Sequence, residues 1–162
     1  MSIIVNGTRA KDVVFNGKNI LFVKNKTLTE IFEKAGIMWT QSNLTKDSFS
    51  GGARYANGLW VACSTSSKGL YWSEDGKTWT QSNITTGFFG GGARYANGLW
   101  VACGLSTSTV VVGLCWSEDG KTWTQSNITK GDFGGGARYA NGLWVACSRA
   151  TDTVNVGLYY SE

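Results

Sequence analysis

GGARYANGLWVAC occupies residues 51–63 and recurs without a substitution at residues 91–103 and 135–147. The first two copies begin 40 residues apart and the last two begin 44 residues apart. Each copy reads as two short strands around an Asn-Gly pair, the strongest two-residue signal for a type I′ hairpin. A fixed period of this length predicts a repeat architecture in which each unit is one supersecondary element.

A second hairpin follows within each unit, in GLYWSEDGKTWTQSN at residues 69–83. Its strands are predicted at residues 70–73 and 78–82, around a turn at residues 74–77. The unit therefore has four short strands, here called A to D in chain order. Four-stranded units of about 40–45 residues are typical of β-propeller blades, and three such units also fit a β-trefoil.

The turn sequence SEDGKTW, at residues 73–79 and 117–123, resembles the Asp-box of sialidase-like (BNR) propellers. The family pattern is Ser-x-Asp-x-Gly-x-Thr-Trp, and this chain is one residue shorter between Asp75 and Trp79. Over residues 37–162 the whole unit resembles repeats of bacterial and phage tail-associated propellers. The resemblance implies an all-β fold with three four-stranded propeller blades per chain; the alternative is a β-trefoil monomer.

The repeat is out of phase with the chain. The segment AGIMWTQSN at residues 35–43 aligns with DGKTWTQSN at residues 75–83, so strand D comes first, and residues 157–162 align with strand C. Three blades are too few to close a propeller ring. We therefore expect a homodimer that forms one six-bladed ring, in which each chain lends strand 37–43 to the last blade of the other.

Residues 1–36 do not follow the repeat and are expected to form a small appendage to the repeats at 37–162. Two Asn-Gly turns, at residues 6–7 and 16–17, lie between apolar runs and predict short strands. Thr27 and Glu30 have capping-box spacing, and the apolar residues that follow predict a short amphipathic helix. A short part of this segment also resembles segments of phage tail and baseplate proteins, and this resemblance implies attachment to a larger particle.

All the drift between repeats falls in two sets of connections. Because strands alternate in direction, the B–C and D–A connections lie at one end of the unit and the two constant turns lie at the other. Loops on a rigid scaffold carry function, so this variable face is the predicted binding face; the alternative is that loops simply tolerate change. The variable connections are residues 64–68, 104–112 and 148–156 (B–C) and residues 44–50, 84–90 and 128–134 (D–A).

The candidate ligand contacts on this face are aromatic and charged. One arginine recurs at the second position of strand A in every unit, and its guanidinium fork suits carboxylates. The alternative role for these arginines is an ion pair with a neighbouring acid or stacking on Tyr55 or Trp60. Large apolar residues in the variable connections are the candidate anchors. The predicted contacts are Phe49, Phe88, Phe89, Phe133, Arg54, Arg94, Arg138, Arg149 and Asp152.

The sequence offers little for catalysis or metal binding. It contains no His, and Asp75 and Asp119 are expected to hold their own turns rather than act as catalytic carboxylates. We predict no catalytic residue, no metal and no cofactor. The four Cys occupy repeat positions too far apart for disulfides and are expected to be reduced. Trp39, Trp79 and Trp123 are expected to pack between blades.

These patterns favour a non-enzymatic, multivalent recognition module that binds a cell-surface glycan or protein through one loop face. The resemblance implies a phage or prophage tail component, associated with a virion or another particle. One alternative is a sialidase-like glycan-processing enzyme, and the other is a structural or engineered repeat scaffold without a ligand. Net charge is +4, and six Lys/Arg against three Asp/Glu in residues 1–36 account for most of it. We therefore expect no nucleic-acid partner, and neither a membrane span nor a signal peptide is predicted.

Overall fold

The computed structural model describes residues 13–15, 18–20, 39–107, 112–149 and 157–162, and these residues form strands, turns and coil without a helix. The chain divides into two compact units, Met1–Thr40 and Gln41–Glu162, whereas the predicted boundary followed residue 36. In the first unit, β1 (Val13–Phe15) pairs antiparallel with β2 (Lys18–Ile20), on either side of the predicted Asn-Gly turn. The helix and the first Asn-Gly turn predicted for this unit lie outside the described residues.

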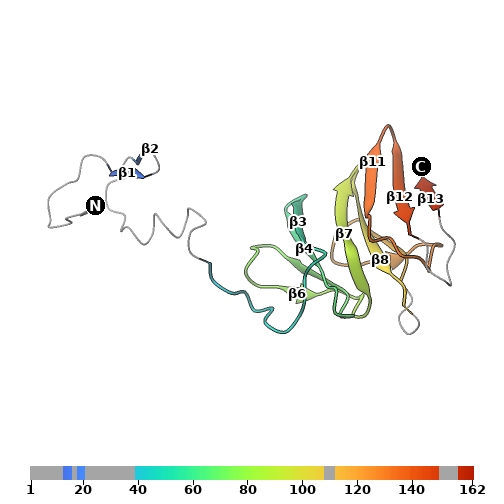
Figure 1. Ribbon diagram of the computed structural model, residues 1–162, viewed down its shortest axis with the longest axis horizontal. Coiled ribbons are helices and arrows are strands. Elements are labelled where there is room, and N and C mark those ends of the chain that lie inside the picture. The colour runs from blue at the N-terminus through green and yellow to red at the C-terminus, as the bar shows by residue number, and fades with distance from the viewer. Residues whose placement is uncertain (1–12, 16–17, 21–38, 108–111, 150–156) are drawn as a thin grey trace. The chain divides into compact units, whose positions relative to one another are not determined.

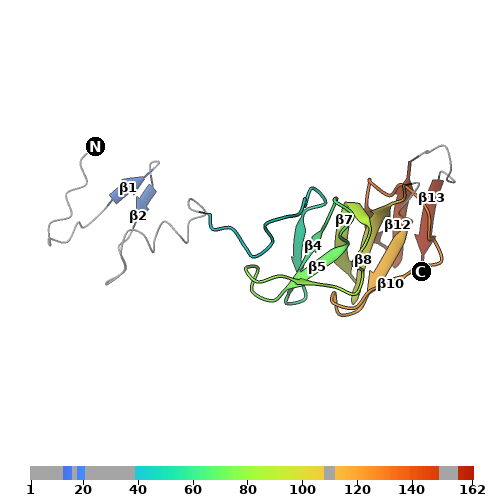
Figure 2. The same cartoon turned by 90° about the horizontal axis from the view of Figure 1, so that it is seen from below.

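The second unit contains three separate antiparallel sheets, and none of them is closed. Figures 1 and 2 show them following one another in chain order, from the green first sheet to the red third sheet. The first sheet consists of β3 (Ala53–Ala56), β4 (Leu59–Cys63), β5 (Leu70–Ser73) and β6 (Thr80–Gln81). The second consists of β7 (Phe88–Ala96), β8 (Leu99–Leu105), β9 (Leu114–Ser117) and β10 (Thr124–Gln125). The third consists of β11 (Ala137–Ala140), β12 (Leu143–Ser148) and β13 (Gly157–Ser161).

The three Asn-Gly hairpins form as predicted. Asn57 has φ 50° and Gly58 has φ 75°, the two positive values that a type I′ turn requires. The equivalent pairs at residues 97–98 and 141–142 have the same geometry. In the first sheet this turn sets the register, with Ala56 opposite Leu59 and Ala53 opposite Ala62. Two of the four strands in each unit are therefore fixed by local chemistry.

The second turn of the first and second units is held by one serine and one aspartate. In the first sheet Ser73 Oγ donates to Asp75 Oδ1 (3.0 Å), and the backbone N–H groups of Lys77 and Thr78 donate to the same oxygen (2.8 Å each). The Gly76 N–H donates to Ser73 Oγ (2.8 Å). The bonds around Asp119 repeat this arrangement. The prediction that both aspartates hold their own turns is confirmed.

The repeated glycine pair before strand A permits close packing between sheets. A Cβ on Gly92 would lie 2.7 Å from the carbonyl oxygen of Gly51, and a Cβ on Gly136 would lie 2.8 Å from that of Gly91. Real Cβ atoms do not approach a carbonyl oxygen so closely, so side chains are excluded here. Glycine therefore lets the first strands of neighbouring sheets approach backbone to backbone.

The core lies between the sheets. One buried cluster joins the first and second sheets and includes Leu59, Leu70, Trp100 and Trp123. A smaller cluster, with Phe133 and Trp144 among its members, joins the second and third sheets. All four cysteines are free, as expected, and three of them are buried; these are Cys63, Cys103 and Cys115. Packing between neighbouring sheets, rather than within any one of them, stabilises the second unit.

The predicted strand 37–43 was expected to pair with a second chain, and within this single chain its described part, residues 39–43, belongs to no sheet. One predicted boundary within the chain is wrong. Residues 88–90, predicted as part of a loop, belong to β7, which runs past a β-bulge between Phe88 and Gly92. The connection into the second sheet is therefore shorter than the sequence indicated.

Candidate binding face

Strand A of each sheet presents one arginine, and these residues, Arg54, Arg94 and Arg138, are called the arginine row below. Strands β3, β7 and β11 are neighbours, since β7 contacts both of the others. Each guanidinium donates from Nη1 to the carbonyl of the preceding alanine, at 3.2, 3.0 and 2.8 Å respectively. This local bond uses one donor of each fork and leaves the remaining N–H groups for other acceptors.

The arginine row concentrates positive charge. Burial is the main cause that lowers the pKa of Arg94, and the charges of Arg54 and Arg138 on either side lower it further. Arg54 and Arg138 are exposed and Arg94 is half-buried. Neither of the two ion pairs found among the described residues involves an arginine of the row. The row is a set of adjacent positive charges, and a bound anion would reduce the repulsion between them.

One variable position before or at the start of strand A contacts one variable position at the end of strand B. Both residues of this pair change together from one repeat to the next. Ser48 and Thr65 bond through their hydroxyl groups (3.1 Å) in the first repeat. In the second repeat, Phe88 lies opposite Leu105. The third repeat places Asp132 opposite Arg149, joined by an ion pair of 2.8 Å. The three sheets therefore offer hydroxyl, apolar and ionic surfaces at equivalent places, and cross-strand pairing explains part of the drift.

A cavity of about 380 Å³ opens beside the ionic pair. It is lined by Gly90, Leu105, Gly134, Gly135 and Arg149, all from the predicted B–C and D–A connections or directly beside them. The Arg149 side chain is 72% exposed and the Asp132 side chain is 12% exposed, so the cation is the accessible member of the pair. The cavity lies on the predicted face, and the ion-paired guanidinium of Arg149 forms part of its wall.

The aromatic anchors predicted on this face are mostly internal. Phe89 and Phe133 are fully buried, so neither ring is accessible to a ligand and both are withdrawn as candidate contacts. Phe49 is half-buried and packs edge-on against Tyr71, with ring centroids 5.6 Å apart. Phe88 remains half-exposed on the face. Asp152 lies outside the described residues.

The burial of the phenylalanines had a signal in the sequence. Phe49, Phe89 and Phe133 occupy the same repeat position, spaced 40 and 44 residues apart like the alanines of strand A. An unvarying position within a variable connection indicates packing rather than ligand contact. Phe88, Ser48 and Asp132 share the preceding position, which does vary.

Sequence reasoning also missed three asparagines. The side chain of Asn83 accepts from the backbone N–H of Trp123 (2.8 Å) and donates to its carbonyl (2.9 Å). Asn43 makes the same two bonds with Trp79, at 2.8 and 3.0 Å. We call this arrangement the asparagine bridge; it joins the end of one repeat to the second turn of the next. Asn127, the third equivalent, makes no side-chain hydrogen bond recorded among the described residues.

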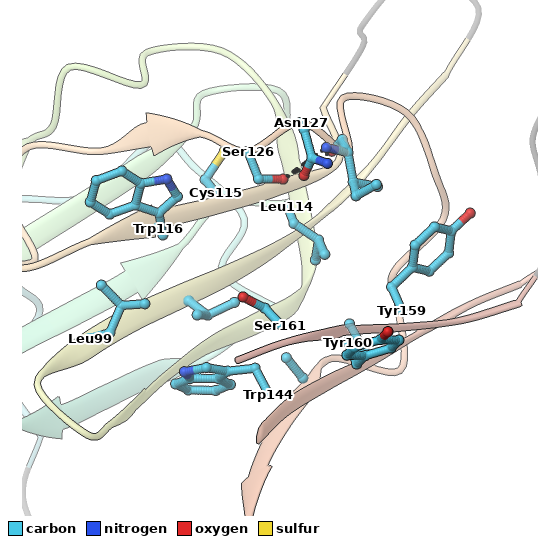
Figure 3. Close-up of a pocket in the computed structure, with 14 residues that line it drawn as sticks. Leu99, Leu114, Cys115, Trp116, Ser126, Asn127, Trp144, Tyr159, Tyr160 and Ser161 are labelled. Atoms are coloured by element: carbon cyan, nitrogen blue, oxygen red, sulfur yellow. Dashed lines mark hydrogen bonds between the residues drawn. The ribbon is translucent and has the colours of Figure 1, made fainter. Parts of the chain in front are cut away.

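A second cavity, of about 200 Å³, lies between the second and third sheets and is called the inter-sheet pocket. Figure 3 shows Leu114 and Trp116 on one side, Trp144 and Tyr159 on the other, and Asn127 at the rim. Its lining is mostly apolar and differs in character from the cavity beside Arg149. Apolar walls with a few polar groups at the mouth are typical of binding sites.

Three of the four cysteines are buried thiols. Burial raises the pKa of the Cys63, Cys103 and Cys115 thiols to about 12, which keeps them protonated and unreactive. In the same part of the chain no group of His, Cys, Asp and Glu is arranged to hold a metal ion. The described residues also include no helix long and apolar enough to cross a membrane.

No protein-family model matches this sequence, and no match was found among curated proteins or solved structures.

Proposed function

We propose that this protein is a non-enzymatic recognition module that binds an acidic cell-surface polysaccharide through the arginine row. The observation that carries the proposal is the row itself: three adjacent guanidinium groups on neighbouring strands, outside both ion pairs of the described residues. A guanidinium fork binds carboxylates in a bidentate manner, and a polysaccharide with regularly spaced carboxylates suits a repeated site. Arg149 and the cavity beside it supply a further, non-repeated contact.

The proposal includes the arrangement of the sheets. We propose that the three sheets are propeller blades and that two chains form one six-bladed ring. The order A–B–C–D within each of the first two sheets supports this arrangement, as does their separation into individual sheets, which a β-trefoil would not have. A ring of two chains would carry two arginine rows, and weak equivalent sites gain avidity on a repetitive surface. A place in a phage or prophage tail rests on the sequence resemblance alone.

The positions of the carboxylates lead us to propose binding rather than hydrolysis. A glycosidase needs two carboxyl groups flanking one bond, about 5–10 Å apart. Asp75 and Asp119 accept several hydrogen bonds within their own turns, and Asp132 is paired with Arg149. Each of these three carboxylates would have to break its hydrogen bonds or its ion pair before it could act in catalysis.

The test is binding of a uronic-acid oligosaccharide, with its carboxyl-reduced form as the matched ligand. We expect Arg94→Gln to weaken binding by about tenfold or more, since charge-assisted hydrogen bonds contribute about 1.5–3 kcal/mol. Arg94→Lys should recover only part of the loss, because lysine keeps the charge but not the planar fork.

The control is Lys77→Gln, which removes the same charge from an exposed position in a constant turn, at the end of the unit away from the predicted binding face. We expect it to leave binding nearly unchanged at 0.15 M salt. Equal losses in Arg94→Gln and Lys77→Gln would mean that only net charge matters. Undiminished binding of the carboxyl-reduced ligand would rule out the carboxylate as the recognised group.

A further inference from the structure

The environment of Trp123 shows how one repeat is locked to the next. Its ring is 2% exposed and belongs to the cluster between the first and second sheets. Leu59 and Val61 contribute to this cluster from the first sheet, and Trp100 contributes from the second. The asparagine bridge joins the Asn83 side chain to the backbone N–H and carbonyl of Trp123. The junction between these sheets thus consists of the buried Trp123 ring and two hydrogen bonds to the Trp123 backbone.

The inter-sheet pocket occupies the equivalent position one repeat later. Adding the repeat spacing to the residues around Trp123 gives residues that line the pocket. Leu59, Val61 and Trp100 correspond in this way to Leu99, Val101 and Trp144. Asn83 corresponds to Asn127, which stands at the pocket rim in Figure 3. The pocket is therefore built as a tryptophan site.

One segment of the chain matches the sequence that fills this kind of site. Trp-Thr-Gln-Ser-Asn occurs at residues 39–43, 79–83 and 123–127. The second and third copies contribute β6 and β10 to their sheets, whereas residues 39–43 form no strand. Trp39 is 88% exposed, the largest exposure among the large apolar side chains of the described residues. An indole this exposed is unusual unless it has a partner.

Three of the large exposed apolar side chains lie on the third sheet. Leu158 and Tyr160 on β13 are each 75% exposed, and Val145 on the neighbouring β12 is 37% exposed. In the first two sheets the equivalents of β13 are β5 and β9, which pair with β6 and β10 along this edge. Strand β13 has no such neighbour among the described residues, so an apolar face and an open strand edge coincide.

We propose that residues 39–43 of a second copy of this chain dock along β13 and insert Trp39 into the inter-sheet pocket. The register follows from β5 and β6, where Trp72 lies opposite Thr80 and Tyr71 lies opposite Gln81. It places Thr40 of the second copy opposite Tyr160, and Gln41 opposite Tyr159. The side chain of Asn127 then forms the asparagine bridge with the backbone of the inserted Trp39.

The occupant is a second copy because the chain cannot reach its own pocket. Asn43 is bonded to Trp79 at the first sheet, and Trp39 lies four positions before it, which allows at most about 14 Å of extended chain. Figures 1 and 2 show the first sheet at one end of the row and β13 at the other. The docking deepens the proposed two-chain ring, and it does not depend on the polysaccharide.

The first experiment measures the mass of the full chain by light scattering. We expect the unaltered protein to have twice the 17.5 kDa of one chain. Trp39→Ala should raise the dissociation constant of the dimer by about 100-fold or more, because a central tryptophan dominates such interfaces. The matched control is Lys130→Ala, also at an exposed position, which should leave the mass unchanged.

Loss of a free surface side chain should leave the Trp39→Ala chain folded, which near-ultraviolet circular dichroism checks. An unaltered protein that remains a single chain at about 100 μM would overturn the proposal. So would a Trp39→Ala chain that associates as tightly as the unaltered one. Neither readout uses a polysaccharide, so failure here is distinct from failure of the arginine row to bind.

The second experiment tests the register by cysteine cross-linking in a Cys147→Ser background, which removes the exposed thiol. Thr40→Cys combined with Tyr160→Cys should give a disulfide-linked dimer under mild oxidation, because directly opposed residues have the required Cβ separation. The control pairs Thr40→Cys with Leu158→Cys, whose natural side chain is equally exposed. We expect at least tenfold less dimer from the control pair. Equal yields, or a disulfide within one chain, would overturn the proposed docking.

Discussion

Asp75 shows how much of a repeat can depend on one side chain. Its Oδ1 accepts hydrogen bonds from two backbone N–H groups, those of Thr78 and Lys77, and from the Ser73 hydroxyl. The backbone bonds, with that of Thr78 the largest cause, lower the pKa of the Asp75 carboxyl to about 2. At Asp119, burial pushes the pKa upward, but the equivalent hydrogen bonds outweigh it and the pKa is lowered. The charged carboxylate is the form that orders the turn.

Acid should therefore weaken the second turns. A carboxyl group with a lowered folded-state pKa stabilises the fold above its unfolded pKa, and this contribution is lost as the pH falls through the folded value. For Asp75 the window runs from the ordinary carboxyl pKa of 3.8 down to the lowered pKa of about 2. We expect Asp75→Asn, which keeps an acceptor oxygen, to lose less stability than the unaltered protein between pH 5 and about pH 2, as measured by urea unfolding.

The control for this prediction is Glu118→Gln, which replaces an exposed carboxyl group directly beside Asp119 in the second-sheet turn. It should follow the unaltered protein across the same pH range. If Asp75→Asn and the unaltered protein lose stability in parallel on acidification, the hydrogen bonds to Asp75 contribute nothing to the pH dependence.

At the scale of elements, the three copies of Trp-Thr-Gln-Ser-Asn show that sequence alone does not set burial. Trp39 is 88% exposed, Trp79 is half-buried and Trp123 is 2% exposed. All three were predicted to pack between blades, and within this chain only Trp123 has a complete sheet on each side. The burial of each ring is decided by whether the preceding sheet is present.

This contrast gives a matched pair of substitutions. Trp123→Ala should cost about 3–5 kcal/mol of unfolding free energy, because a large buried ring is removed from a packed core. Trp79→Ala should cost about 2 kcal/mol less, because its ring is already partly solvated. Urea unfolding at a protein concentration below the onset of association measures both. Equal costs would show that the preceding sheet does not control the packing of these rings.

The sequence predicted what is local to a repeat and missed what depends on two repeats. Asn57-Gly58 predicted its hairpin because the turn requires positive φ at both positions, and strand β5 was predicted with its observed bounds. Phe89 was misplaced because its burial is created by the neighbouring sheet. The asparagine bridge of Asn83 was missed because it joins residues 40 positions apart. The arginine row was predicted from one strand position, but its lack of acid partners among the described residues required the structure.

At the scale of the whole molecule, two parts of the chain have complementary chemistry. One is segment 39–43, which has the sequence of strand D and carries the exposed indole of Trp39. The other is the third sheet, with the inter-sheet pocket and the exposed side chains of β13. In the proposed docking the chain associates head to tail, and closure of the proposed ring after two copies would cover the open edge of β13. The arginine rows of both copies would then belong to one ring.

The two asparagines at equivalent positions test this arrangement. Asn83 bridges sheets within one chain, whereas Asn127 is proposed to bridge two chains. Association stabilises the folded state by mass action. The midpoint temperature of thermal unfolding of the unaltered protein should therefore rise with protein concentration. Asn83→Ala should lower the midpoint at every concentration. The expected loss in free energy of unfolding is about 1–3 kcal/mol, because the substitution leaves backbone groups unpaired. Asn127→Ala should match the unaltered protein when dilute and fall below it as concentration increases. Thermal unfolding at concentrations from about 1 to 100 μM makes the comparison; if Asn127→Ala lowers the midpoint of the dilute chain as much as Asn83→Ala does, Asn127 acts within its own chain and the head-to-tail bridge is wrong.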